Sequence, residues 1–310
     1  MWRAKRLGAV ASRFAVLQNL RGGARPRLAD FVTDIGDVRG TSRSTRVFRR
    51  IARLPERPIP MYWFSGRPNL GDVLSAVVVA HVSNATPVLV SSRHKGKVLA
   101  VGSILHRLAE SDIVWGSGAI RDMPITPPPR VTFRAVRGPL TRALIRADVP
   151  EIYGDPAMLL PRIFRPSAAK RFQLGVIPHY LEADVVRVVD PAISLIDVLS
   201  DWRSVIERII ECEAIVSSSL HGLIIAEAYG VPAIWFTATD RVTGAGFKFR
   251  DYYLCTGRPP PEPIRWGGSL ASMSRGMTDP PAIDIEPLMH AWPKELTFST
   301  PIQTQRHARV

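Results

Sequence analysis

Residues 214–236 read AIVSSSLHGLIIAEAYGVPAIWF, and this stretch decides the fold. It begins with a short β-rich run, Ala214–Ser217, and continues through an apolar stretch of helical length, Leu220–Tyr229. Gly230 is a typical helix stop, and Ala233–Phe236 is a second β-rich run. A strand, a helix and a strand in this order predict a βαβ unit with parallel strands.

The same alternation extends over the chain from residue 58 onward. Strands are predicted at Met61–Phe64, Val98–Val101, Ile113–Trp115, Val131–Val136, Gln173–Ile177 and Val186–Val189, and helices at Val73–His81, Pro139–Arg146, Trp202–Ile210 and Ile285–Trp292. The pattern predicts an α/β protein with two Rossmann-like domains and a central cleft, joined near Pro161–Ser167.

Four segments are therefore expected along the chain. They are a basic, disordered N-terminal arm (1–57), an N-terminal Rossmann-like domain (58–163), a C-terminal Rossmann-like domain (164–257) and a C-terminal extension (258–310) that packs back or is partly disordered.

The chain of 310 residues carries a net charge of +14, which by itself suggests a nucleic-acid or membrane protein. Residues 1–57 hold 14 lysines and arginines against four acids, a net charge of +10. The rest of the chain holds 27 bases against 23 acids, a net charge of +4. Because the body is nearly balanced, no nucleic-acid partner is expected for it.

The basic arm has three interpretations. A secretory signal is rejected, because Ser12 and Arg13 interrupt its best apolar run, Leu7–Leu17. A polybasic arm could contact an anionic membrane peripherally. The third interpretation is a solvated tail, or a start codon placed upstream of the true one, since Met61 could itself initiate.

The rest of the sequence favours a cytoplasmic protein, with membrane contact at the inner face through the arm. No run of about 18 apolar residues predicts a transmembrane helix. Cys212 and Cys255 belong to no metal-binding or disulfide pattern, which is typical of a reducing compartment.

Four short motifs follow predicted strands, at turns that line the ligand crevice of open α/β sheets. The first, Arg67-Pro68-Asn69-Leu70-Gly71-Asp72, combines a turn glycine with helix amides that favour an anion, although an ordinary capping turn explains it equally well. The second, Trp115-Gly116-Ser117-Gly118, lacks the third glycine of the dinucleotide fingerprint. A nicotinamide cofactor is therefore poorly supported.

The third motif is Arg137-Gly138-Pro139-Leu140-Thr141, in which Arg137 ends a strand directly before a helix. A guanidinium beside free helix amides suits a carboxylate or phosphate, because arginine can hold either with two hydrogen bonds. The alternative is a structural ion pair with a nearby acid such as Asp155. The residues alone favour neither interpretation.

The fourth motif, Ser217-Ser218-Ser219-Leu220-His221-Gly222, joins the strand to the helix of the opening stretch. Three hydroxyls cluster where helix N–H groups lack partners, which favours an anion. His221 is either the titrating group of a site or a buried histidine bonded to backbone. The serine run and Gly222 favour the site. Weaker candidates are Asp155, in Gly154-Asp155-Pro156, His179, in Pro178-His179-Tyr180, and Lys248, in an expected loop.

Together these motifs resemble the polysaccharide pyruvyl transferase family, and most closely its bacterial exopolysaccharide members that place a pyruvate ketal on a hexose. The resemblance runs from about Tyr62 to Gly257 and depends on the order and spacing of the motifs. Besides the four above it includes Gly102-Ser103-Ile104-Leu105-His106, Gly154-Asp155-Pro156, Pro178-His179-Tyr180 and Phe247-Lys248-Phe249-Arg250-Asp251-Tyr252-Tyr253.

The resemblance implies a fold similar to the GT-B glycosyltransferases and a transfer of pyruvate from phosphoenolpyruvate to a hexose of a cell-surface polysaccharide precursor, free or lipid-linked. The implied product is a ketal, expected to be 4,6-linked, with release of phosphate. No metal or cofactor is expected, because arginine and helix ends can neutralise the phosphate.

The motif match and the local chemistry together assign the roles. His221 is the predicted catalytic acid or base. The predicted donor-binding residues are Arg137, Ser218, Ser219, Gly222 and Lys248. The residues predicted to position the acceptor are Asn69, Asp72, Asp155 and His179.

Two other functions remain open on the sequence. One is a nucleotide-sugar-dependent GT-B glycosyltransferase, in which Glu227 would contact ribose. The other is a non-enzymatic carbohydrate- or nucleic-acid-binding protein that uses the basic arm.

Overall fold

The computed structural model describes residues 33–34, 57–65, 70–267 and 277–298, which belong to one compact unit, residues 32–310. Most of the predicted basic arm lies outside these described residues, and so does Asn69.

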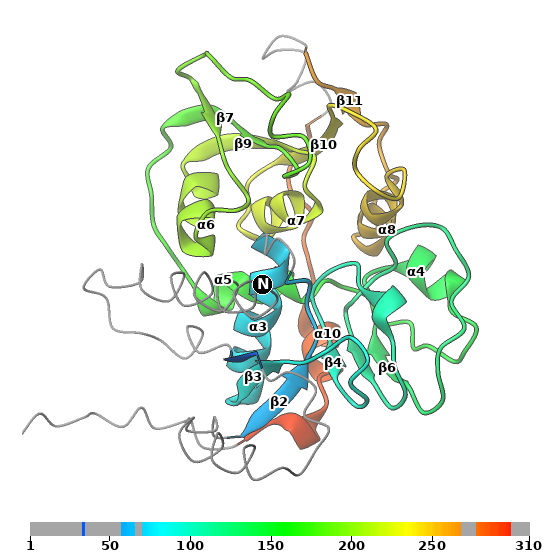
Figure 1. Ribbon diagram of the computed structural model, residues 1–310. Helices are drawn as coiled ribbons and strands as arrows, with labels where there is room; N and C mark the ends of the chain where they lie inside the picture. The colour runs from blue at the N-terminus through cyan, green and yellow to red at the C-terminus, as the bar shows by residue number, and fades with distance from the viewer. Residues whose placement is uncertain (1–32, 35–56, 66–69, 268–276, 299–310) are drawn as a thin grey trace, which may run out of the picture. The chain divides into compact units, whose positions relative to one another are not determined.

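The first sheet is parallel and has the strand order β1-β3-β2-β4-β5-β6 within the described residues (Figure 1). Its strands are β1 (Thr33–Asp34), β2 (Pro58–Met61), β3 (Thr86–Leu89), β4 (Val98–Leu99), β5 (Ile113–Trp115) and β6 (Thr132–Ala135). Helix α3 (Leu70–Ser83) connects β2 to β3, and the short helix α4 (Pro139–Leu144) follows β6.

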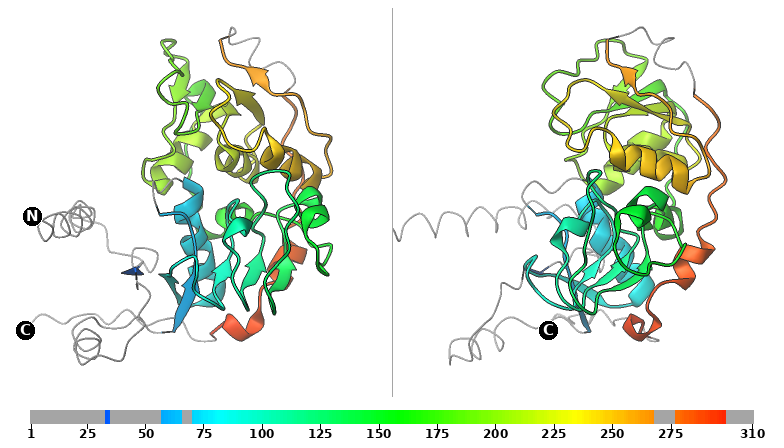
Figure 2. Two further views of the ribbon diagram at one scale, coloured as in Figure 1. Left: turned by 45° about the vertical axis from the view of Figure 1, so that its right-hand side comes forward. Right: turned by 90° about the vertical axis from the view of Figure 1, so that its right-hand side faces the viewer.

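The second sheet is also parallel, with the order β11-β10-β9-β7-β8 (Figure 2). Its strands are β7 (Phe172–Ile177), β8 (Ile193–Leu195), β9 (Cys212–Ser217), β10 (Ala233–Thr237) and β11 (Ile264–Arg265). Its helices are α6 (Trp202–Ile210), α7 (Leu220–Ala228) and α8 (Phe247–Cys255).

The βαβ unit predicted at 214–236 is confirmed as β9–α7–β10, with Ile215 opposite Ala233 and Ser217 opposite Trp235. Its residues explain its position. Helix α7 is apolar on nearly every side and is buried along most of its length. Val216 of β9 and Phe236 of β10 belong to a buried cluster together with Val176 of β7. Parallel strands covered on both faces read as continuous apolar runs, as these do.

Two predicted elements are wrong. Residues 186–189 do not form a strand, and Val189 is 98% exposed. The chain turns at Asp190, and the edge strand β8 begins only after this turn. The expected loop around Lys248 is instead helix α8, which begins at Gly246 in a left-handed conformation. Its Phe249 stacks on Trp235 with ring centroids 4.6 Å apart, and this tertiary contact fixes the helix.

The C-terminal part of the described chain crosses to the first sheet. Helix α10 (Glu286–His290) buries Leu288, whose carbonyl accepts a hydrogen bond from the Trp115 indole at 2.8 Å. Trp292 meets the same indole edge-to-face at 4.8 Å. Two smaller helical segments, η3 (Pro156–Leu159) and α5 (Leu160–Ile163), lie in the chain between the two sheets.

The prediction of an α/β protein with two parallel sheets is confirmed. Similarity to the GT-B fold and the domain boundaries stay predictions. Among the described residues, no helix combines the length and the apolar character needed to cross a membrane.

Candidate active site at the start of helix α7

Three neighbouring strands of the second sheet, β7, β9 and β10, end at one edge, where α7 begins (Figure 1). This edge carries His179 after β7 and Ser218 after β9. Because ligands of open α/β sheets bind outside the carboxyl ends of the strands, the fold brings the fourth motif to the expected place.

His221 lies in the first turn of α7 and faces Asp155, the residue that caps η3. His221 Nε2 is 3.5 Å from Asp155 Oδ2, and the two side chains are 14% and 0% exposed. The other oxygen of Asp155 accepts the Ala157 N–H at 3.0 Å. Neither Nε2 nor Oδ2 has a hydrogen-bond partner among the described residues. The pair is therefore an acid–base couple, slightly longer than a hydrogen bond, that a small movement would close.

Gly71 of the first motif lies close against the imidazole of His221. A Cβ atom on Gly71 would lie only 2.0 Å from His221 Nδ1. Any side chain at position 71 would therefore displace the ring. Asp72 follows in the same turn of α3 and is 7% exposed.

His179 forms the side of the site next to β7. Its N–H donates to Ser218 Oγ at 2.8 Å, and its Nδ1 accepts the Leu181 N–H at 3.3 Å. Burial lowers the pKa of His179 to about 3, helped by the charges of Lys248 and His221. His179 is therefore neutral at pH 7, and with Nδ1 as an acceptor its proton sits on Nε2.

Lys248, in the first turn of α8, supplies a cation close to these histidines. Burial and, to a smaller extent, the charge of Arg137 lower its pKa to about 8, whereas the charge of Glu182 opposes the shift. A lysine depressed in this way gains its full charge most easily when an anion binds beside it. Lys248 thus supplies a positive charge close to the neutral His179, an arrangement suited to a small anion.

The predicted serines and glycine mainly shape the turn into α7. Ser217 Oγ accepts the Ser219 N–H at 3.1 Å, and Ser218 Oγ is occupied by His179. A Cβ on Gly222 would lie 2.5 Å from Ser217 Oγ, so this glycine lets the helix approach the strand. Ser219 is the N-cap residue, and its side chain makes no capping bond to the helix.

Arg137, a predicted donor-binding residue, is held in a buried ion pair. Its side chain is 0% exposed, and its Nε donates to Asp251 Oδ2 at 3.0 Å. Its two terminal nitrogens donate to Ser103 Oγ at 2.5 Å and to the Ala119 carbonyl at 2.6 Å. The alternative from the sequence, a structural ion pair, describes this geometry, with Asp251 as the partner instead of Asp155.

Asp251 joins the third motif to α8, and sequence reasoning gave it no role. Its carboxylate also accepts the Thr141 N–H at 2.9 Å and the Thr141 hydroxyl at 2.6 Å. A Cβ on Gly138 would lie 2.2 Å from the Asp251 carbonyl, and one on Gly118 would lie 2.3 Å from Arg137 Cζ. Gly118 of the second motif and Gly138 of the third thus leave room for this buried joint. Lys248 lies one helical turn before Asp251, so the joint fixes its position.

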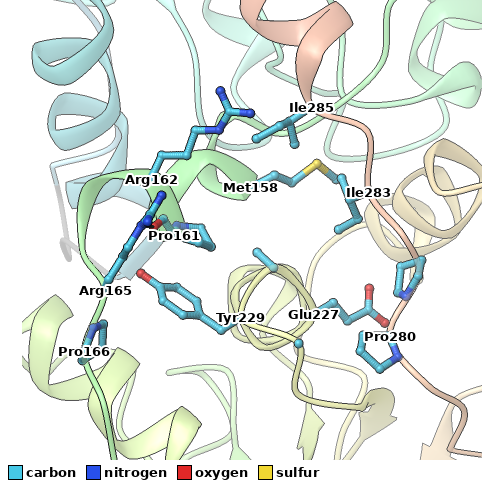
Figure 3. A pocket seen from close by; sticks show the side chains of 13 residues that line it. Met158, Pro161, Arg162, Arg165, Pro166, Glu227, Tyr229, Pro280, Ile283 and Ile285 are labelled. Carbon is cyan, nitrogen blue, oxygen red and sulfur yellow. Dashed lines mark hydrogen bonds between the residues drawn. The ribbon is translucent and has the colours of Figure 1, made fainter.

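Glu227 is occupied by protein groups. Arg258 binds it with two nitrogens at 2.8 and 2.7 Å, and the Tyr252 hydroxyl donates to it at 2.6 Å. Glu227 lines a pocket of about 550 Å³ with Met158, Tyr229 and Arg162 (Figure 3). This pocket lies at the far end of α7 from His221, and no residue of the predicted site lines it. The geometry therefore does not favour the ribose contact of the glycosyltransferase alternative.

Comparison with known proteins agrees with these motifs. Residues 129–240 match the family model described as polysaccharide pyruvyl transferase, a range that includes Asp155, His179 and His221. The chain is 29% identical over 209 residues to the succinoglycan biosynthesis protein ExoV of Rhizobium meliloti (strain 1021), covering 62% of this chain and 63% of that protein. It is 27% identical over 215 residues to the uncharacterized protein L143 of Acanthamoeba polyphaga mimivirus, covering 63% and 74%.

The chain thus spans less than two thirds of the length of the succinoglycan protein. No solved structure matches it. The resemblance predicted from the motifs is confirmed, because residues 129–240 match the model of the polysaccharide pyruvyl transferase family.

Proposed function

We propose that this protein transfers the pyruvyl group of phosphoenolpyruvate to a hexose of a polysaccharide precursor. The product is a cyclic ketal, 4,6-linked, and inorganic phosphate is released. The family match and the similarity to a succinoglycan biosynthesis protein support pyruvyl transfer to a polysaccharide. The donor and the ketal linkage are the proposed part.

The observation that carries the proposal is the meeting of His221, Asp155, His179 and Lys248 at the start of α7. His221 and Asp155 form an acid–base pair, the His179 N–H donates to Ser218, and the charge of Lys248 acts on the pKa of His179. Phosphoenolpyruvate carries a phosphate and a carboxylate on one small carbon frame. A depressed lysine beside the start of a buried helix is suited to hold such an anion.

The reaction balances with these groups alone. The methylene carbon of the donor gains a proton and becomes the methyl group, two carbon–oxygen bonds to the sugar form, and the bond to phosphate breaks. Of the two hydroxyl protons, one replaces the proton given to the methylene carbon and the other leaves on the phosphate.

His221 is the group placed to move these protons, with Asp155 holding the imidazole and stabilising its charged form. His179, neutral with a proton on Nε2, is suited to donate a hydrogen bond to a donor oxygen. Lys248 offsets the negative charge that grows on the departing phosphate.

The test is incubation of the full chain with phosphoenolpyruvate and a panel of free and lipid-linked glycosides. We expect saccharide-dependent phosphate release together with the mass gain of a ketal. No release with any acceptor would refute the proposed function.

The variant His221→Ala should lose turnover by about 10²–10⁴-fold, the usual contribution of acid–base catalysis, while keeping its thermal melting temperature. The matched control is His94→Ala, an exposed histidine on the first-sheet side of the chain. Turnover equal in both variants would show that the site has been placed wrongly.

A further inference from the structure

A second pocket opens beside the candidate site, at the ends of β10 and the loop before α8. Its volume is about 560 Å³, within the range of about 300–1,000 Å³ usual for small-molecule sites. Ser218, whose hydroxyl holds His179, forms part of its wall. None of the other residues with a predicted catalytic, donor or acceptor role lines it.

Glu182 provides the first unpaired group of this pocket. The side chain is 0% exposed, and its Oε1 accepts the Thr239 N–H at 2.6 Å and the Ala238 N–H at 3.2 Å. Its Oε2 is buried and has no hydrogen-bond partner in the described part of the chain. An unpaired buried carboxylate oxygen is costly, so a ligand that donates a hydrogen bond to it is favoured.

Thr237 provides the second unpaired group of this pocket, and it comes from another segment of the chain. It ends β10, directly before Ala238, which Glu182 holds. Its Oγ1 is also buried and finds no partner among the described residues. Glu182 and Thr237, each with a buried oxygen atom that has no partner among the described residues, therefore line the same pocket.

The charges of the lining do not favour an anionic ligand. The acids and arginines in it are equal in number, namely Glu182, Asp240, Glu262, Arg241, Arg250 and Arg265. Arg241 is already engaged by the Asp184 carboxylate. The net charge of the lining is near zero, in contrast to the positive charge that Lys248 supplies to the candidate site. A neutral ligand rich in hydroxyl groups matches this lining best.

We propose that this pocket binds a neutral hexose unit, with hydroxyl groups of the sugar bonded to Glu182 Oε2 and Thr237 Oγ1. This inference rests on the proposed function in one respect only: the bound hexose is the acceptor sugar of the pyruvyl transfer. Donor and acceptor would then enter from the two sides of Ser218, so that the reacting hydroxyls meet the donor near His221.

Binding can be tested without turnover. Saturation-transfer NMR titrations of the full chain would use methyl β-D-glucopyranoside and methyl β-D-galactopyranoside as probes. The decisive variant is Thr237→Val, which keeps the shape of the side chain and removes a hydroxyl that has no hydrogen-bond partner among the described residues. We expect the Kd of the bound glycoside to rise about fivefold or more, the loss of one hydrogen bond. Glu182→Gln should weaken binding as well.

The matched control is Thr132→Val, an exposed threonine on β6 of the first sheet, which should bind as the wild type does. The affinity for phosphoenolpyruvate, measured by phosphorus NMR, should be unchanged in Thr237→Val. Loss of glycoside binding with unchanged donor binding supports the proposal.

Three results would overturn it: no binding of either glycoside to the wild type, wild-type binding in both pocket variants, or displacement of the glycoside by uridine diphosphate. These results are separate from failure of the proposed function. If glycosides bind in the pocket but phosphate is never released, the saccharide site stands and the pyruvyl transfer falls. If phosphate is released but Thr237→Val binds glycosides as the wild type does, the pyruvyl transfer stands and the saccharide site falls.

Discussion

Lys248 is the residue of the candidate site whose charge changes just above physiological pH. Its pKa is lowered to about 8, first by burial and then by the charge of Arg137. The free enzyme therefore loses this positive charge as the pH rises through about 8. An anionic donor then no longer meets a positive charge at Lys248.

We expect kcat/KM for phosphoenolpyruvate to fall as the pH rises through about 8, while kcat falls at a higher pH, because a bound anion raises the pKa of the lysine. Lys248→Met should raise KM for the donor and remove this alkaline limb. Lys248→Arg should keep the charge, and the limb should move to higher pH. A limb unchanged in Lys248→Met would assign it to another group. The measurement is the pH profile of phosphate release.

Gly71 is the residue that sets the position of the imidazole. In Gly71→Ala the new methyl group would overlap the His221 ring, whose Nδ1 would be only 2.0 Å away. Since misplacement of a catalytic group by about 1 Å can cost about 10²-fold, we expect kcat to fall by about that factor with little loss of stability. Val73→Ala, in the same turn and 37% exposed, is the control and should retain activity. Normal kcat in Gly71→Ala would mean that His221 does not act in this position.

At the scale of elements, the ion pair between Arg137 and Asp251 joins the end of β6 to α8. Both side chains are 0% exposed. Removing one partner leaves a buried charge without compensation, which typically destabilises a protein by about 3–5 kcal/mol. We therefore expect Arg137→Met to lower the free energy of unfolding by about this amount, measured by urea denaturation.

The control for this pair lies three residues earlier on the same strand. Arg134 pairs with Glu295 at 3.0 Å, with side chains 42% and 58% exposed, and exposed pairs contribute less than about 1 kcal/mol. Arg134→Met should therefore unfold nearly as the wild type does. A stable Arg137→Met variant that only binds phosphoenolpyruvate poorly would instead restore the donor-binding role predicted from the sequence.

The elements also show which sequence signals were sufficient. Helix α6 and strand β5 have the predicted bounds, because an amphipathic face and a buried β-rich run are local properties. Strand β3 and helix α8 were not predicted. Thr86–Leu89 is short and contains Pro87, which argues against an inner strand, and α8 depends on the stack of Phe249 on Trp235. Propensity carries no information about such a partner.

At the scale of the whole molecule, the charge and the site are separated along the chain. The arm of residues 1–57 carries +10, whereas every described group of the candidate site comes from the nearly balanced remainder. We expect a chain without residues 1–31 to keep its phosphoenolpyruvate-dependent turnover. Its binding to vesicles containing anionic lipid at low salt should weaken.

The readouts for the shortened chain are phosphate release and vesicle co-sedimentation at low and high salt. Full vesicle binding by the shortened chain would show that the body, and not the arm, contacts anionic lipid. Loss of turnover would show that residues 1–31 take part in the reaction.

By itself the sequence determined the α/β class, the central βαβ unit and the set of motifs, because periodicity, turn residues and motif spacing are written along the chain. It also identified His221, Asp155, His179 and Lys248 as candidates, but not their arrangement. Only the tertiary structure decided that Arg137 forms an ion pair with Asp251, that Gly71 adjoins the imidazole of His221, and that Glu182 and Thr237 line the same pocket. These facts depend on contacts between residues far apart in sequence, and burial, which decides whether a charged group binds a ligand or another residue, exists only after the chain has folded.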